Sequence, residues 1–223
     1  MDYKLLSGSL LFQGLTCVEI QQSLDAVSYH VEHYNKGDIV FHSMDEATRI
    51  GIILSGKIEA QKTFPNGSQV NVTIRTAGEL IGPAAAFSST GMYPCDVVSV
   101  DTTRVLFFRK QDLLKLMALN ERIMQNITQQ LATAAYMLQR RLELFSYNGI
   151  SQKIAFFLLM HCRQSQSQQF IIPDSMTKWA MMMNVSRPSL HRELKKMADR
   201  GTIRYAPPVI EILNKDTLHD ILA

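Results

Sequence analysis

The chain has 223 residues, of which 46% are hydrophobic and 19% charged, as is ordinary for a folded protein with one or two cores. Its net charge of +3 excludes a strongly acidic or basic polymer. The longest apolar run, residues 154–160, is too short for a membrane span, and the first residues lack the basic and apolar regions of a signal peptide. We therefore expect a cytoplasmic protein with no membrane partner.

Residues 1–28 are predicted to form a short helical lead-in, after which the pattern changes. Short runs rich in β-branched residues alternate with turn signals from Ser28 to about Arg109, and Pro65–Ser68 is a hairpin turn signal. Several short strands at near-regular spacing predict a β-sandwich or barrel.

The next segment, from Gln111 to Phe145, contains neither Pro nor Gly and predicts one long helix. Its residues at alternating +4 and +3 spacing are mostly apolar, as in a heptad seam. The seam consists of Leu113, Met117, Asn120, Met124, Ile127, Leu131, Ala134, Leu138, Arg141 and Phe145. The length favours pairing with a second copy, and the alternative is a long helix packed on its own β-domain.

Tyr147-Asn148-Gly149 interrupts that helix and is the predicted joint between domains. A further helix follows over residues 150–162, then a polar loop and a short strand at Phe170–Ile172. The sequence thus divides into a β-domain at residues 1–110, a pairing helix at 111–147 and a C-terminal domain at 148–223.

The most informative stretch runs from Ser175 to Tyr205 and predicts two short helices joined by a tight turn. Asn184 suits the turn because Asn tolerates a left-handed backbone. Ser186 is a good N-cap, and Pro188 falls in the first helical turn, where a missing N–H costs little. Two β-type runs at residues 202–205 and 209–213 then predict a small hairpin, or wing.

The second helix has one apolar stripe, formed by Leu190, Leu194 and Met197, and one basic face. Residues 148–223 hold ten Lys or Arg against six Asp or Glu, so the positive charge is concentrated at this end. Such donors suit phosphates and guanine edges. The alternative, a basic helix pair that only packs, is disfavoured by the caps, turn and wing occurring in order.

A β-domain, a long pairing helix and a winged helix-turn-helix, in that order, resemble the cyclic-AMP receptor protein and Fnr (Crp/Fnr) family of bacterial transcription regulators. The most specific match is the run Val185-Ser-Arg-Pro-Ser-Leu-His-Arg-Glu-Leu194. The resemblance implies an α+β fold with an N-terminal cyclic-nucleotide-binding-like β-roll and a C-terminal winged helix-turn-helix. It also implies a homodimer that binds promoter half-sites in double-stranded DNA and works with RNA polymerase.

The resemblance also implies which residues touch DNA. Arg187 matches the family's arginine that reads guanine, Ser189 matches a phosphate contact, and Arg192 matches a second basic contact. His191 stands where many members carry a smaller residue. The full expected set is Ser186, Arg187, Pro188, Ser189, His191, Arg192 and Lys195.

The sensor end departs from the pattern of cyclic-AMP binders in this family. Pro83 stands at the position of their ribose-binding Glu, and Tyr93-Pro94 at that of their phosphate-binding Arg-Ser pair. Leu138-Gln139 replaces the Thr-Ser pair that they place against adenine. A phosphate left without a cation would be desolvated and unpaired, so we do not expect cyclic AMP as the effector.

No cofactor is evident from the sequence. The N-terminal cysteine cluster of the Fnr iron–sulfur site is missing and the six His show no axial pair, so neither an iron–sulfur cluster nor haem is expected. We expect an unidentified, weakly polar small-molecule effector in an apolar pocket of the β-roll, and the alternative is a filled roll with no ligand. The expected lining is Gly82, Pro83, Ala84, Ala85, Phe87, Tyr93, Met137 and Leu138.

Three widely spaced cysteines, Cys17, Cys95 and Cys162, form no metal-binding motif, and redox sensing by one of them is left open. No metal site and no catalytic residues are expected, because phosphate-loop, metal-spaced His and nucleophile motifs are missing. An enzyme built on the β-domain is therefore disfavoured. The remaining rival to a DNA-binding regulator is a dimeric ligand-binding or scaffold protein without specific DNA affinity.

Overall fold

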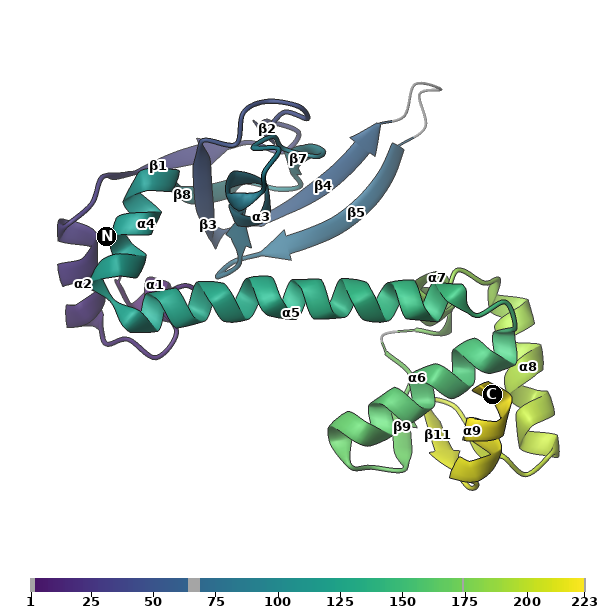
Figure 1. Ribbon diagram of the computed structural model, residues 1–223. Helices are drawn as coiled ribbons and strands as arrows, with labels where there is room; N and C mark the ends of the chain where they lie inside the picture. The colour runs from purple at the N-terminus through teal and green to yellow at the C-terminus, as the bar shows by residue number, and fades with distance from the viewer. Residues whose placement is uncertain (1–2, 64–68, 174, 223) are drawn as a thin grey trace. The chain divides into compact units, whose positions relative to one another are not determined.

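A computed structural model describes residues 3–63, 69–173 and 175–222, which form two compact units, Met1–Thr133 and Ala134–Ala223. Figure 1 shows the helices and strands of each unit. The expected α+β fold, with a β-roll and a C-terminal winged helix-turn-helix, is confirmed. The turn expected at Pro65–Ser68 lies outside the described residues.

The first unit begins with two short helices, α1 (Tyr3–Ser7) and α2 (Cys17–Asp25). Thr16 caps α2 because its hydroxyl accepts from the Glu19 N–H while the Glu19 carboxylate accepts from the Thr16 N–H, a capping box. The predicted helical lead-in is therefore two helices with a loop between them.

Two antiparallel sheets form the roll. One has the strand order β1-β8-β3-β6 and the other the order β2-β7-β4-β5. The strands are β1 (Tyr29–Tyr34), β2 (Ile39–Phe41), β3 (Arg49–Ser55), β4 (Lys57–Thr63), β5 (Gln69–Thr76), β6 (Leu80–Ile81), β7 (Asp96–Ser99) and β8 (Thr103–Arg109). A short helix, α3 (Pro83–Phe87), follows β6.

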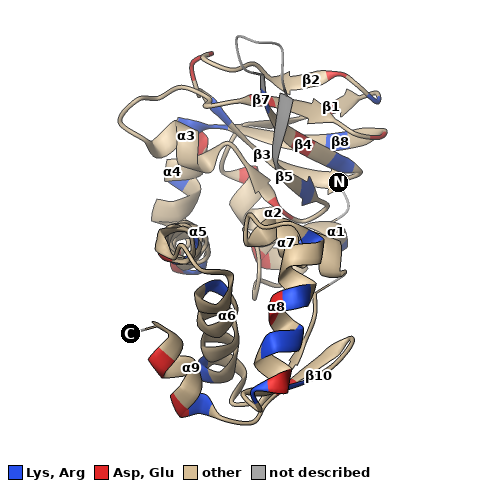
Figure 2. Cartoon of the chain, turned by 90° about the vertical axis from the view of Figure 1, so that its right-hand side faces the viewer, with Lys and Arg blue, Asp and Glu red and all other residues tan. Residues whose placement is uncertain are grey.

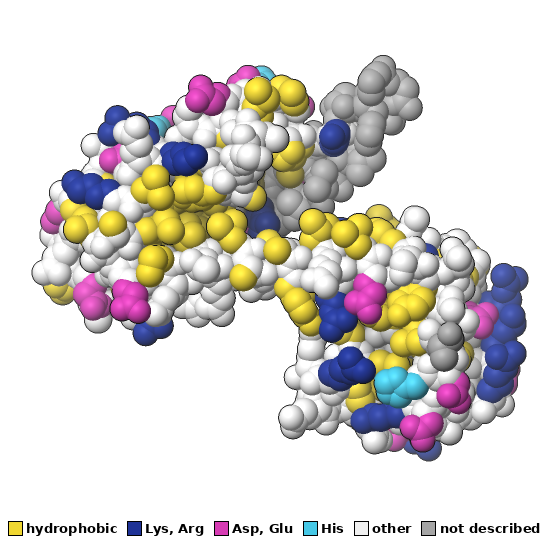
Figure 3. All heavy atoms as spheres, viewed as in Figure 1, with side chains coloured by type: hydrophobic (Ala, Val, Ile, Leu, Met, Phe, Trp, Pro, Cys, Tyr) yellow, Lys and Arg dark blue, Asp and Glu magenta, His cyan; other side chains and the backbone are white. Residues whose placement is uncertain are grey.

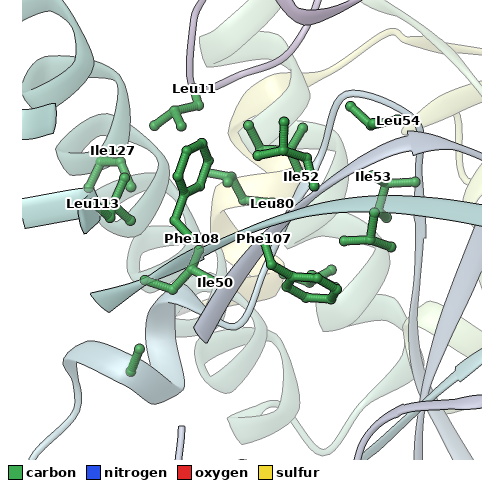
Figure 4. Packing of buried hydrophobic residues seen from close by; sticks show 14 of the residues in the cluster. Leu11, Ile50, Ile52, Ile53, Leu54, Leu80, Phe107, Phe108, Leu113 and Ile127 are labelled. Carbon is green, nitrogen blue, oxygen red and sulfur yellow. The ribbon is translucent and has the colours of Figure 1, made fainter. Parts of the chain in front are cut away.

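Strands β3 and β8 carry the centre of the roll's core. Ile50, Ile52, Phe107 and Phe108 are fully buried there, as Figure 4 shows. The interior is tightly filled at Gly51, where an added Cβ would lie within 2.6–2.9 Å of the Val105, Phe107 and Ile81 side chains. Packing this close leaves little space around the middle of β3.

The prediction of one continuous helix over residues 111–145 is wrong, because the helix is interrupted at Asn120. Helix α4 (Lys110–Leu119) ends before Asn120, and α5 (Glu121–Ser146) begins after it. The Asn120 backbone is extended, and its side-chain oxygen accepts from the Arg122 and Ile123 N–H groups. Asn120 therefore acts as a cap rather than as a helix-interior seam position.

The first half of the predicted seam packs inside its own unit. Leu113 and Ile127 are buried in the roll's core, so the alternative of packing on the β-domain holds for this half. The buried Asn126 fixes the start of α5, because its amide donates to the carbonyls of Leu11 and Gln13 at 2.9 Å each. Beyond Thr133 the side chains of Met137, Leu138, Leu142 and Phe145 are exposed.

The second unit contains the end of α5 and the C-terminal elements. These are α6 (Ile150–Ser165), β9 (Gln169–Ile171), α7 (Met176–Met182), α8 (Arg187–Asp199), β10 (Ile203–Ala206), β11 (Val209–Ile212) and α9 (Lys215–Leu222). The predicted wing is confirmed, since β10 pairs antiparallel with β11 and Ile203 lies opposite Ile212. Strand β9 adds the third strand on the other side of β11.

Leu144, Trp179, Leu190, Leu194 and Ile210 share one core in this unit. Tyr147 and Ile150 pack against the same core, so the residues on both sides of the interruption at 147–149 belong to one compact unit. The helix pair is thus built on a hydrophobic centre of its own.

Replacing Leu194 by Ala should lower the free energy of unfolding of the C-terminal unit by about 2–5 kcal/mol, because the side chain is fully buried and its removal leaves a cavity. Urea unfolding followed by fluorescence of Trp179, the only Trp in the chain, measures this unit selectively. Met181→Ala is the control, because the Met181 side chain is exposed. Equal midpoints for the two variants would contradict the packing described here.

Candidate nucleic-acid interface and sensor cavity

The first turn of α8 is fixed by hydrogen bonds of its own sequence. Ser186 caps the helix, and its hydroxyl oxygen accepts from the Ser189 N–H at 3.2 Å. The Ser186 hydroxyl also donates to the Ser189 hydroxyl oxygen at 2.8 Å. Pro188 sits in the first turn, as predicted. The start of the helix, where the expected base contacts lie, is therefore held by hydrogen bonds within the chain itself.

The turn before α8 has the expected left-handed residue. Asn184 has φ +52°, and its N–H donates to the carbonyl of Met181. Val185 then donates to the Ala180 carbonyl at 3.0 Å. Because Met183 is completely buried, the turn is anchored in the core of the C-terminal unit.

A buried lysine, which the sequence analysis did not single out, supports this turn from α6. Lys153 is 9% exposed and its ammonium donates to the Met183 carbonyl at 3.1 Å. This hydrogen bond satisfies a carbonyl at the end of α7. Its position in the sequence could have revealed this role. Lys153 precedes Phe157 by four residues, which places the lysine on an apolar face of α6.

Three cationic side chains of the predicted set are exposed on α8: Arg187, Arg192 and Lys195. Figure 2 shows Lys and Arg following one another along this helix. Lys196, by contrast, lies 3.5 Å from the Glu193 carboxylate. The buried stripe of Leu190, Leu194 and Met197 fixes the opposite face, so the basic side chains point to solvent.

His191 is held by the wing. Its Nδ1 lies 2.9 Å from the Tyr205 hydroxyl, and the two rings meet edge to face with centroids 5.6 Å apart. Burial raises the pKa of Tyr205, while the nearby Arg187 charge opposes the rise. The wing strand therefore orients one predicted contact residue and lies close to another. Tyr205 was missed because the contact joins residues fourteen positions apart.

In the roll, several expected effector-pocket residues come together around Gly82. Gly82 has φ +85° and begins α3, which contains Pro83, Ala84, Ala85 and Phe87. A Cβ at Gly82 would lie 3.4 Å from the Phe41 and Tyr93 rings. Met137 and Leu138 belong to the other unit and are exposed on α5.

Tyr93 fills space in the roll. Its side chain is 4% exposed, its ring stacks on Phe41 with centroids 4.0 Å apart, and its hydroxyl donates to the Arg49 carbonyl at 2.7 Å. Burial raises the pKa of Tyr93, so the hydroxyl stays protonated as a donor. Tyr93 thus supports the roll from within.

A cavity of about 240 Å³ lies beside Tyr93, and its lining is polar rather than apolar. It is lined by Ile39, Val40, Phe41, His42, Asp45, Glu46, Thr48, Arg49 and Tyr93. Arg49 is fixed by the Glu32 carboxylate at 2.7 Å and lies over the Phe107 ring at 4.4 Å. Partial burial disfavours the charged form of Glu32, but hydrogen bonds from Tyr34 and His30 and the Arg49 charge outweigh it and lower the pKa.

The three cysteines differ in their exposure to solvent. Cys17 is exposed, Cys162 is buried, and Cys95 is half-buried with its pKa raised by burial and the neighbouring Asp96. Across residues 3–63, 69–173 and 175–222 no three His, Cys, Asp or Glu side chains are grouped to hold a metal ion. In the same part of the chain no helix is long and apolar enough to cross a membrane.

Comparison with known families matches both units. A cyclic nucleotide-binding domain matches residues 31–120, and a Crp-like helix-turn-helix domain matches residues 152–221. The cyclic AMP receptor protein of Thermus thermophilus is 25% identical over 216 residues, which cover 97% of this chain and 98% of that protein. The probable transcriptional regulator flp of Lacticaseibacillus casei is 22% identical, with 94% of each chain covered.

The solved structure of the Thermus thermophilus catabolite activator protein superimposes with a TM-score of 0.57. The two chains are 25% identical, and the alignment covers 96% of this chain and 98% of the other. These likenesses extend over nearly the whole chain rather than over the helix-turn-helix alone.

Asn184→Ala should destabilise the C-terminal unit by about 1 kcal/mol, because a residue with a Cβ and no local hydrogen-bonding side chain is strained at φ +52°. Asn184→Gly keeps the left-handed turn at little cost and serves as the matched control. Urea midpoints read from Trp179 fluorescence distinguish the two. Equal destabilisation by Ala and Gly would show that backbone strain does not govern the turn.

Proposed function

Because the chain belongs to the Crp/Fnr family of transcription regulators, we propose that it is a homodimer that binds specific promoter half-sites and responds to a small effector in its β-roll. In this proposal residues 1–110 are the sensor domain, 111–147 the dimerisation region and 148–223 the DNA-binding domain. The protein acts in the cytoplasm together with RNA polymerase, and performs no catalysis.

One observation carries the DNA-binding part of the proposal: a capped helix buries its apolar stripe and exposes Arg187, Arg192 and Lys195. A helix with a fixed N-terminus and exposed cations fits the major groove, where an Arg can pair with both acceptors of a guanine. The expected contact set remains Ser186, Arg187, Pro188, Ser189, His191, Arg192 and Lys195. Ser189 is the expected phosphate partner beside Arg187, and Ser186 caps the helix.

The exposed apolar residues of α5 support dimerisation. In the second unit Leu138, Leu142 and Phe145 follow one another at the +4 and +3 spacing of a heptad and are all exposed. This stripe differs from the predicted seam because Leu142 replaces Arg141, which makes it more apolar. A heptad stripe exposed to solvent fits a second copy of the same helix.

The sensor part of the proposal rests on the cavity beside Tyr93 and on the residues around Gly82. Pro83 offers no side-chain charge and no N–H, and the Tyr93 hydroxyl is already bonded to the Arg49 carbonyl. At these two positions a cyclic phosphodiester gains neither a cation nor a free donor. We therefore propose an effector other than cyclic AMP.

Arg187→Ala should reduce the preference for a target site over scrambled DNA by about 1–3 kcal/mol, the value of a bidentate Arg–guanine pair. Fluorescence anisotropy on both duplexes measures the preference. Lys195→Ala is the contrasting variant. Loss of a phosphate contact should weaken binding to both duplexes equally and lower the slope of log affinity against log salt concentration by about one. Undiminished preference in Arg187→Ala would contradict the assignment.

Leu138→Glu combined with Leu142→Glu should weaken self-association by about 100-fold or more. Burying one Leu contributes about 1.5–3 kcal/mol, and 1.4 kcal/mol corresponds to a factor of ten. Sedimentation velocity across a concentration series measures the monomer–dimer equilibrium. Thr133→Glu is the control, because Thr133 is exposed on the opposite side of α5. A parent chain that stays monomeric throughout would exclude the dimer.

Titration calorimetry with cyclic AMP should give no saturable heat with the purified chain, since Pro83 and Tyr93 supply no phosphate partner. Correct folding of the sample is checked by its unfolding transition. Saturable binding that is lost when Tyr93 is replaced by Phe would contradict this prediction and place the nucleotide in the roll.

A further inference from the structure

A second cavity lies wholly within the C-terminal unit, away from the basic face of α8. Its volume is about 110 Å³, and three helices line it. The lining residues are Arg140, Glu143, Tyr147, Phe156, Leu159, Met160, Arg163, His219 and Leu222. None of them belongs to the expected DNA-contact set or to the expected effector pocket.

Each helix contributes residues of one face. On α6, Phe156, Leu159, Met160 and Arg163 stand at i, i+3, i+4 and i+7, so three apolar side chains and one cation share a stripe. On α9, His219 and Leu222 are three residues apart, and on α5 so are Arg140 and Glu143. The three faces converge to give an apolar floor with charged side chains around it.

The floor is well packed. Phe156 and Leu159 are each 6% exposed, and Tyr147 packs against Phe156 with ring centroids 5.5 Å apart. The Arg140 guanidinium lies 5.8 Å from the centre of the Phe156 ring. Figure 3 shows cationic, acidic and His side chains around hydrophobic ones on the visible face of the C-terminal unit.

The charges of the lining are not balanced. Arg140 donates to the Glu143 carboxylate at 2.9 Å and to the Tyr136 hydroxyl at 3.0 Å, so its charge has a partner. Arg163 and His219 have no side-chain hydrogen bond or ion pair with any residue that the structure describes. An anion entering the cavity would therefore find one unneutralised guanidinium and one imidazole beside an apolar floor.

We propose that this cavity binds a small organic carboxylate with a compact apolar body of about one six-membered ring. The carboxylate pairs with Arg163 and His219, and the ring lies on Phe156, Leu159, Met160 and Leu222. The cavity of about 110 Å³ is smaller than an engineered apolar cavity of about 150 Å³ that holds benzene, so one ring is the largest body it takes, and the carboxylate stays at the rim beside the exposed Arg163 and His219 side chains. Arg is the side chain best suited to a carboxylate, since its planar fork donates two parallel hydrogen bonds.

Occupancy at this position would link α5, α6 and α9 within the unit that carries the DNA-binding helix. A ligand shifts a conformational equilibrium only by its differential affinity for the states. A carboxylate that bridges α6 and α9 favours the states in which these helices keep their present contact. This site is separate from the proposed effector pocket in the roll, so either can exist without the other.

The test is a ¹⁹F NMR titration of the full-length, DNA-free protein with 4-fluorobenzoate, with 4-fluorobenzamide as the neutral analogue of the same shape. We expect saturable binding of the acid at one site per chain, at least tenfold tighter than the amide. Arg163→Met should weaken acid binding by at least tenfold and leave amide binding unchanged. Arg200→Met, an exposed Arg outside the cavity lining, should change neither.

The position of the ligand is read from ¹³C-methyl spectra of labelled methionine, with the Met160 signal identified by its loss in Met160→Leu. The acid should shift this signal, and Trp179 fluorescence checks that each variant is folded. Three results would each overturn the proposal: no saturable binding, equal affinity for acid and amide, or an affinity for the acid that Arg163→Met leaves unchanged. DNA does not enter the experiment, so its outcome is independent of the proposed DNA-binding function.

Discussion

The orientation of α8 depends on the burial of its apolar stripe. Leu190, Leu194 and Met197 have almost no exposure, so the helix can take only one rotational setting in its unit. That setting turns Arg192 and Lys195 to solvent, and the Ser186 cap fixes where the helix begins. The Lys153 ammonium donates to the Met183 carbonyl, and this hydrogen bond holds the turn between α7 and α8. Specific contact with DNA needs such order before binding, because positions ordered in advance lose less entropy on association.

The two units hold cavities of opposite chemistry. The cavity in the roll is polar and lies beside Arg49, whose charge Glu32 already neutralises. The cavity of the C-terminal unit has an apolar floor and an unneutralised Arg163. If both proposals hold, the two cavities bind small molecules of different charge.

Much of the fold could be predicted because its signals are local. The Ser186 cap, the Pro188 position and the left-handed Asn184 each depend on neighbouring residues, and each is present. The errors have tertiary causes or involve competing local roles. Asn120 fits a seam by spacing, yet its side chain caps α5 and divides the helix.

The site was predicted less completely than the fold, for the same reason. The contact between His191 and Tyr205 joins two elements that no periodicity links, so the role of the wing in orienting His191 could not be read from the chain. The polar cavity beside Tyr93 arises where the loop at residues 42–48 meets residues 91–93 through backbone hydrogen bonds such as that from the Met44 N–H to the Tyr93 carbonyl. The prediction of an apolar pocket considered only the residues near Gly82. The polar loop residues that line the cavity are distant from Gly82 in sequence, so they were not included.

Selection of binding sites from a random pool of duplex DNA by the purified chain tests the central claim most directly. A dimer that places two α8 helices in successive major grooves should enrich a two-fold symmetric motif, with half-site centres about 34 Å, or about one helical turn, apart. The same selection with Arg187→Ala should lose a guanine from each half-site. A pool that stays random after repeated rounds at moderate salt, while the protein remains folded, would contradict the account.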